Sequence, residues 1–149
     1  ENPKNLDLKL YFKDEEFAYQ VLAAKEGIRQ AFSGHKAVLE GDGVEQVSLS
    51  NQAGVEKGSV KRAFSDGRFY LMASVQNLEM LSKGYYYGGW LMGEEMDDVY
   101  TGRIGYQEGE GTLYYLNNKD LTQYSEMVIT LEPENGDGVP GEVVLSAEF

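Results

Sequence analysis

The chain of 149 residues contains no cysteine and only one histidine, His35. Without cysteine it can form no disulfide, no thiolate metal site and no cysteine nucleophile. A single histidine excludes a histidine-rich metal site, and any Ser-His-Asp triad would have to use His35. No nucleophile-elbow motif and no Walker motif occur in the sequence. Carboxylates are therefore the main candidates for chemistry, and we expect no metal, no cofactor and no enzyme activity.

Basic residues are also scarce, because 13 Lys and Arg stand against 25 Asp and Glu and give a net charge of −12. A surface this negative repels phosphate backbones and anionic lipids, so nucleic acid is not an expected partner. No run of about 20 apolar residues is present to span a bilayer, and no signal-peptide pattern opens the chain. Residues 1–5 (ENPKN) resemble a polar tether. We expect membrane contact only through an upstream anchor that this chain does not contain.

The first forty residues differ from the rest and form one predicted unit, a tether followed by a helix. Asp14 is a suitable N-cap, and two glutamates follow it in the first turn. Gly34 supplies a C-terminal stop. Between them, apolar residues recur at spacings of three and four, which predicts a helix over residues 14–33; they are Phe17, Val21, Ala24, Ile28 and Phe32. The apolar stripe either packs on the domain that follows or binds a partner.

Residues 41–149 form the second predicted unit, in which short alternating runs of β-forming residues are separated by Gly, Asp and Asn. Asp66-Gly67 between two such runs predicts a tight hairpin. In the run after it, Phe69 and Leu71 share one face, and Tyr70 lies on the other. The predicted strands are residues 47–49, 59–64, 69–75, 85–92, 99–106, 112–116, 127–131 and 142–147. The pattern predicts a mainly β fold, an immunoglobulin-like antiparallel β-sandwich of about seven or eight strands.

Acidic clusters in the connections between these runs are the remaining places for chemistry. Paired carboxylates serve glycosidases, and oxygen-rich glycine turns serve calcium, but solvated loops have the same composition. The turns lack the ligand pattern of an EF-hand loop, and we expect the acidic clusters to act as solvated surface. They are Glu94 and Glu95 with Asp97 and Asp98, Glu108 with Glu110, residues 134–138 and residues 41–43.

Aromatic residues are concentrated in residues 85–91 (YYYGGWL). On a strand, Tyr85, Tyr87 and Gly89 lie on one face, and Tyr86, Gly88 and Trp90 lie on the other. We expect one face to fill the core. The other face is a candidate platform for carbohydrate or peptide, and the candidate ligand-binding residues are Tyr85, Tyr87 and Trp90.

The order of motifs across residues 46–149 resembles the C-terminal extracytoplasmic domain of anti-sigma-K-type factors. A strand begins at Gly58, Asn77-Leu78 precedes the YYYGGWL segment, and Thr101-Gly102 follows it. The most specific part is residues 128–133 (VITLEP), followed by an Asn-Gly-Asp-Gly turn, Pro140 and the apolar residues 143–145. These motifs are similar to the aromatic-x-Gly-Trp-Leu and Val-Thr-Leu-Glu-Pro segments of that family.

The resemblance implies a non-catalytic, membrane-tethered regulatory or sensory β-sandwich outside the cytoplasmic membrane. In the complete bacterial regulators, a cytoplasmic domain binds the sigma factor and one helix crosses the membrane. Neither is visible in this sequence, so the expected partner is another protein or an upstream segment that this chain lacks. The alternative is a secreted or lipid-anchored β-sandwich that binds carbohydrate or peptide at the cell surface through its tyrosines and tryptophan.

Overall fold

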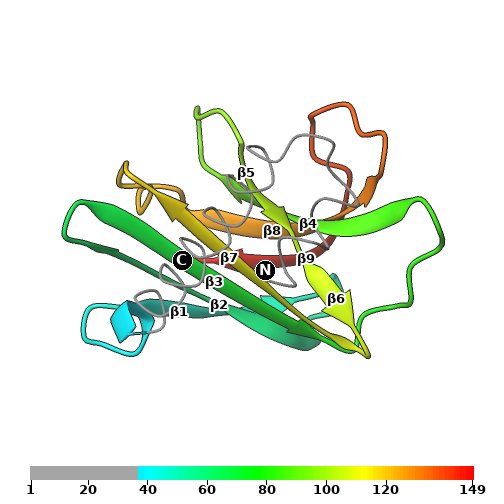
Figure 1. Ribbon diagram of the computed structural model, residues 1–149, viewed down its shortest axis with the longest axis horizontal. Helices are drawn as coiled ribbons and strands as arrows, with labels where there is room; N and C mark the ends of the chain where they lie inside the picture. Colours follow the sequence, from blue (N-terminus) through cyan, green and yellow to red (C-terminus); the bar gives the residue numbers. More distant parts are fainter. Residues whose placement is uncertain (1–36) are drawn as a thin grey trace, which may run out of the picture. The chain divides into compact units, whose positions relative to one another are not determined.

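The computed structural model describes residues 37–149 and contains one antiparallel sheet of nine strands. A single helical turn at residues 37–39 precedes them. Their order across the sheet is β5-β4-β8-β9-β1-β2-β3-β7-β6 (Figure 1). The strands are β1 (Glu45–Ser50), β2 (Glu56–Ser65), β3 (Arg68–Gln76), β4 (Tyr85–Met92), β5 (Val99–Arg103), β6 (Gly105–Gln107), β7 (Glu110–Asn117), β8 (Glu126–Pro133) and β9 (Glu142–Glu148).

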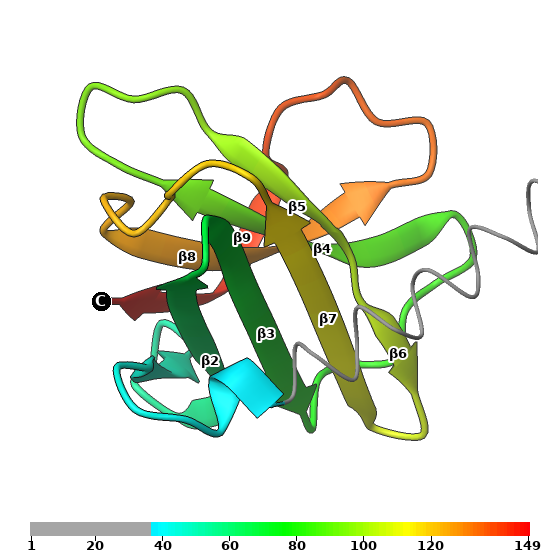
Figure 2. The same ribbon diagram turned by 60° about the vertical axis from the view of Figure 1, so that its left-hand side comes forward.

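The sheet has two halves that are joined by a narrow seam. Strands β5, β4, β8 and β9 form one half, and β1, β2, β3, β7 and β6 form the other. In the seam, only one residue pair, Ser50 with Ser146, links β1 to β9 among the described residues. The sheet curls so that β5 also approaches β7, as Figure 2 shows. The two halves therefore enclose one core between them.

The hairpin of β2 and β3 shows how local sequence builds this core. Asp66 and Gly67 have φ values of 51° and 74°, which are the positive angles that a tight hairpin turn requires. After the turn, every second residue of β3 is buried. The buried residues face a cluster supplied by both halves of the sheet, which includes Leu49, Val60, Phe69, Leu71, Val75, Tyr87, Leu91, Leu113, Met127, Ile129 and Leu145.

Residues 99–107 pass from one half of the sheet to the other. Strand β5 pairs with β4, whereas β6 pairs with β7. Between them, the buried side chain of Ile104 enters the core, and its N–H donates to the carbonyl of Tyr87 at 2.8 Å. The predicted single strand over residues 99–106 is therefore two strands, because its backbone changes partner at Ile104.

The prediction of a mainly β, antiparallel fold is confirmed. The strands number nine because the 99–106 segment divides, and the two facing layers of the expected sandwich are halves of one curled sheet. The predicted helix over residues 14–33 lies outside the described residues. Within residues 37–149, no helix has the length and apolarity needed to cross a bilayer.

Candidate functional site

Strand β4 contributes to two separate concave sites because its aromatic residues alternate between its faces. Tyr87 points into the core and is 3% exposed, whereas Tyr85 at the start of the strand is 47% exposed. Both line one pocket. Tyr86 and Trp90 lie on the opposite face and line a second cavity. The alternation predicted for this segment is confirmed, and it separates the three candidate ligand-binding residues between two places.

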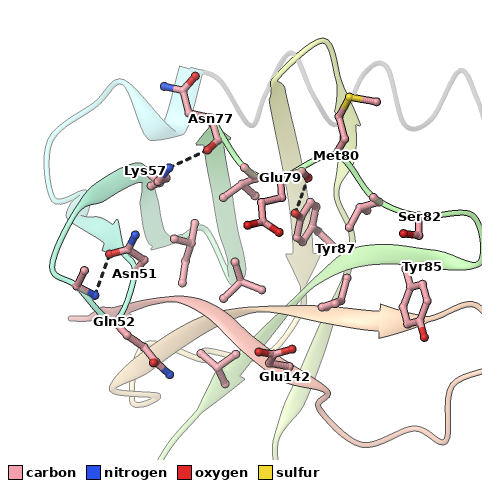
Figure 3. Close-up of a pocket in the computed structure, with 17 residues that line it drawn as sticks. Asn51, Gln52, Lys57, Asn77, Glu79, Met80, Ser82, Tyr85, Tyr87 and Glu142 are labelled. Carbon is pink, nitrogen blue, oxygen red and sulfur yellow. Dashed lines mark hydrogen bonds between the residues drawn. The ribbon is translucent and has the colours of Figure 1, made fainter.

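The first site, which we call the end pocket, has a volume of about 530 Å³. It lies among the β1–β2 turn, the β3–β4 loop, the start of β4 and the start of β9 (Figure 3). Its apolar lining includes Leu78, Leu81 and Val143. Met80 stands at the pocket with 94% of its surface exposed. The volume falls within the range of about 300–1,000 Å³ that is typical of ligand sites.

Side chains from three strands fix the loop that forms one wall of the end pocket. Three consecutive carbonyls of this loop, those of Asn77, Leu78 and Glu79, each accept a hydrogen bond. Lys57 Nζ donates to Asn77 at 2.8 Å, Tyr106 Oη to Leu78 at 2.7 Å, and Tyr87 Oη to Glu79 at 2.7 Å. Because the donors come from β2, β6 and β4, this wall is held in place without regular secondary structure.

The opposite wall of the end pocket is formed by the seam between β1 and β9. The β1–β2 turn is closed by Asn51, whose Oδ1 accepts hydrogen bonds from the N–H groups of Ala53 and Val55 at 3.0 and 2.9 Å. Strand β9 pairs with β8 from Glu142 onward, with a bulge near Val143. Within residues 37–149, β9 pairs with β1 only at Ser146, so no described strand pairs with the other edge of residues 142–145, beside the pocket.

Among the described residues, the charged side chains that line the end pocket are two carboxylates and one ammonium group. The carboxylates of Glu79 and Glu142 stand on opposite sides of it (Figure 3). Lys57 is the only cationic side chain among the described residues that line it, and its ammonium group is bound to the Asn77 carbonyl. The pocket therefore offers two carboxylates to a ligand and favours positive charge.

The second site, which we call the aromatic cleft, has a volume of about 440 Å³. Tyr86 and Trp90 of β4 and Tyr100 of β5 supply three aromatic rings, and the β8–β9 loop forms the opposite wall with Val139. The rings of Trp90 and Tyr100 are tilted by 53° with centroids 4.9 Å apart. The hydroxyls of Tyr86 and Tyr100 lie 3.3 Å apart, within hydrogen-bond distance.

A buried carboxylate, Glu132, lines the aromatic cleft. Its Oε2 accepts hydrogen bonds from Trp90 Nε1 at 3.1 Å, from the backbone N–H of Gly141 at 2.8 Å and from the hydroxyl of Thr130. Gly88 lies beneath it, where a Cβ would stand 3.3 Å from Glu132 Cγ. The cluster fixes Trp90 and anchors the return of the β8–β9 loop. No local pattern around Glu132 predicts that this side chain is buried.

The electrostatics of the cleft rim keep Tyr100 protonated. Burial raises the pKa of Tyr100 above its ordinary value of 10.0; the hydrogen bond with Tyr86 and the negative charge of Glu132 act in the same direction, and the positive charge of Arg103 opposes them. Nearby, the guanidinium of Arg103 lies over the Tyr86 ring, 4.6 Å from its centroid, and pairs with Glu134 through bonds of 3.0 and 2.7 Å. The charge of the Glu134 carboxylate at the cleft rim is therefore balanced by Arg103.

The acidic clusters considered in the sequence lie in exposed connections. Glu94, Glu95, Asp97 and Asp98 occupy the β4–β5 loop, and Glu108 and Glu110 belong to the β6–β7 hairpin. Asp137 closes its own turn by accepting a hydrogen bond from the Val139 N–H at 3.2 Å. Residues 37–149 hold no group of three or more acidic or histidine side chains arranged to bind a metal. His35 lies outside this range.

Comparison with known proteins identifies no matching family, no matching characterised protein and no matching solved structure.

Proposed function

We propose that this chain is a non-catalytic regulatory domain that works outside the cytoplasmic membrane and binds an extended peptide in its end pocket. One observation carries the peptide assignment. Residues 142–145 of β9 pair with β8 on one edge, and within the described chain β9 joins β1 only at Ser146. The edge that faces the pocket can thus accept a further strand, and main-chain hydrogen bonds are the main source of affinity in this mode of peptide recognition.

The lining of the pocket indicates the chemistry of this peptide. Alternate side chains of an added strand point to opposite sides, so one set would face the apolar residues Leu78, Leu81 and Tyr85. The Glu79 and Glu142 carboxylates would meet side chains at the ends of the pocket. A peptide that alternates apolar and basic residues satisfies both conditions.

The regulatory part of the proposal is supported by the order of sequence motifs that resembles the anti-sigma-K-type domain. A bound peptide stabilises the folded state, by about 2.7 kcal/mol at a peptide concentration 100 times the Kd. Stabilisation lowers the population of open states that proteases attack. Peptide binding would in this way control proteolysis of the tether that joins the domain to an upstream segment.

The binding assignment is tested by NMR titration with a short synthetic peptide of alternating lysine and valine. Three matched peptides serve as controls: one with glutamate in place of lysine, one with alternate backbone nitrogens methylated, and one with scrambled order. We expect the first peptide to shift the amide signals of residues 142–145 and of the β3–β4 loop, and the methylated and acidic peptides to bind at least tenfold more weakly. Equal binding by the methylated peptide would refute strand addition.

The location is tested separately with the full gene product in its native cells. Digestion of spheroplasts, whose cytoplasmic membrane is intact, by an external protease should remove the domain, and digestion only after lysis of the spheroplasts would refute the proposed location. The alternative, a secreted or lipid-anchored surface module, predicts the same peptide binding and the same sensitivity to protease. It differs in lacking a cytoplasmic sigma-binding domain, so the upstream part of the gene distinguishes the two.

A further inference from the structure

The aromatic cleft lies on the opposite face of β4 from the end pocket, and its chemistry points to a different ligand. We propose that it binds a methylated ammonium ion of the choline class, free or as the head of a larger molecule. Three aromatic rings, a buried carboxylate and a cavity of about 440 Å³ meet there. This inference does not depend on the proposed function of the end pocket.

Glu132 is a buried carboxylate, and none of the ion pairs within residues 37–149 involves it. It is 3% exposed, and all three donors to its Oε2 are neutral groups, those of Trp90, Thr130 and Gly141. No hydrogen bond or ion pair of the described residues ends on Oε1. Among the described residues, Thr101 Oγ1 is the only side-chain N or O atom that is both fully buried and without a partner. Glu132 Oε1 has no partner there either, so it is not fully buried and keeps some exposed surface in the cleft that Glu132 lines. A buried carboxylate gains most from a cation that reaches it.

The aromatic rings of the cleft also favour a cation. Cations bind over the faces of Trp and Tyr rings, and a group of such rings is the usual receptor for quaternary ammonium. Here Trp90, Tyr86 and Tyr100 border the cavity. The guanidinium of Arg103, which is not part of the cleft lining, makes a cation–π contact with the Tyr86 ring, 4.6 Å from its centroid.

The choice among cations follows from the groups available. A metal ion needs several oxygen ligands at short distance, and no such group of three acidic side chains exists among residues 37–149. A primary ammonium needs an acceptor for each of its three N–H groups, whereas a fully methylated ammonium has no N–H group and binds through aromatic and apolar surface beside a negative charge. The lining also contains the carboxylates of Asp98 and Glu134, so acceptors are present, and it is the three rings and Val139 that favour the methylated ion.

The experiment uses the whole chain and follows the Trp90 indole N–H and the tyrosine ring signals by NMR. Choline chloride is compared with sodium chloride at equal ionic strength and with 3,3-dimethyl-1-butanol, the neutral analogue of choline. We expect choline to shift the Trp90 signal with a Kd of about 1–10 mM, which two or three cation–π contacts can support. The neutral analogue should bind at least tenfold more weakly. Equal shifts with the neutral analogue or with sodium, or no shift with choline, would overturn the proposal.

Two variants locate the site, and a third is the matched control. Tyr100→Leu changes an exposed ring and should weaken choline binding at least fivefold. Glu132→Gln keeps the shape of the buried side chain but removes its charge, and should weaken binding at least tenfold. Tyr85→Leu removes an exposed ring that lines the end pocket and is not part of the cleft lining, and it should leave choline binding unchanged. If Glu132→Gln fails to fold, the Tyr100 and Tyr85 variants decide the outcome: equal affinity in both contradicts a site in the cleft.

Discussion

The adjacent glycines of β4 give the sharpest test of the packing, because they face opposite sides of one strand. A Cβ on Gly89 would stand 2.6 Å from Leu113 Cδ2, 2.7 Å from Thr101 Oγ1 and 3.0 Å from Met127 Cε. A Cβ on Gly88 would meet its nearest side chains, those of Glu132 and Tyr100, at 3.3 Å. The same substitution one residue apart should therefore have very different effects.

Overpacking a core costs about 1–3 kcal/mol. Replacing glycine by alanine also stabilises the fold by about 0.4–1 kcal/mol, because alanine lowers the conformational entropy of the unfolded chain. We expect Gly89→Ala to lower the free energy of unfolding by about 1–2 kcal/mol, which corresponds to a fall in Tm of roughly 5–10 °C for a domain of this size. Gly88→Ala should cost less, about 0.5–1 kcal/mol, because the exposed Tyr100 ring can move aside, whereas the buried Glu132 side chain must give by only a few tenths of an ångström.

Urea unfolding followed by Trp90 fluorescence measures both values, and calorimetry checks that each transition is two-state. Leu113→Val in the Gly89→Ala background tests the cause, because it shortens the side chain that the new methyl group meets first. The double variant should be more stable than the sum of the single effects predicts, by about 0.5 kcal/mol or more. Equal losses for the two glycines, or no coupling to Leu113, would show that the clash does not limit this strand.

Three further predictions concern the turn, the end pocket and the cleft. Gly67→Ala should lower the free energy of unfolding by about 1 kcal/mol, because φ is 74° at this residue and no atom crowds the new methyl group. Urea unfolding measures this change, and Gly105→Ala, at an uncrowded strand position, is the control. Tyr87→Phe should cost about 1 kcal/mol and speed amide exchange in the β3–β4 loop, because the carbonyl of Glu79 loses its donor; unchanged exchange would show that this bond does not fix the loop. Because the pKa of Tyr100 is raised in the folded state, its contribution to stability is full below pH 10.0 and is lost as the pH rises through the higher folded pKa. In a spectroscopic titration, Tyr86→Phe should lower the pKa of Tyr100, and an unchanged pKa would contradict the hydrogen bond as a cause.

Local patterns in the sequence carried most of the strand prediction. The turn at Asp66-Gly67 needs only two residues with positive φ, and the alternation of buried Phe69 and Leu71 with the partly exposed Tyr70 needs only a half-buried strand. Both signals are contained in a few consecutive residues. They could therefore be found without knowledge of any long-range contact.

The structural features that the sequence patterns did not predict depend on contacts between residues that are distant in the chain. Arg62 is buried at 3% exposure, with its guanidinium against the Phe149 ring and bonded to the Tyr124 carbonyl and to Glu45. Nothing around Arg62 in the sequence distinguishes it from an exposed strand residue. The division of residues 99–107 at Ile104 has the same origin, because the choice of a pairing strand is not encoded locally.

The candidate site was predicted in part. The alternation of aromatic residues in β4 followed from the sequence, but the course of the loops that turn each face into a concave site did not. The aromatic cleft needs the β8–β9 loop, which is fixed by Glu132 through Gly141 and by the pair of Arg103 with Glu134. Those contacts join residues from separate strands, so composition and spacing could not reveal them.

The division of residues 99–107 between the two halves of the sheet also bears on self-association. Both outer strands of the sheet, β5 and β6, come from this one segment and have only five and three residues. Short edge strands give another copy little backbone to pair with, which protects β proteins from aggregation. The edge at the start of β9, which no described strand pairs with, carries Glu142 in a chain of net charge −12. Like charge opposes the addition of a second copy at that edge, whereas a basic strand would be attracted to it.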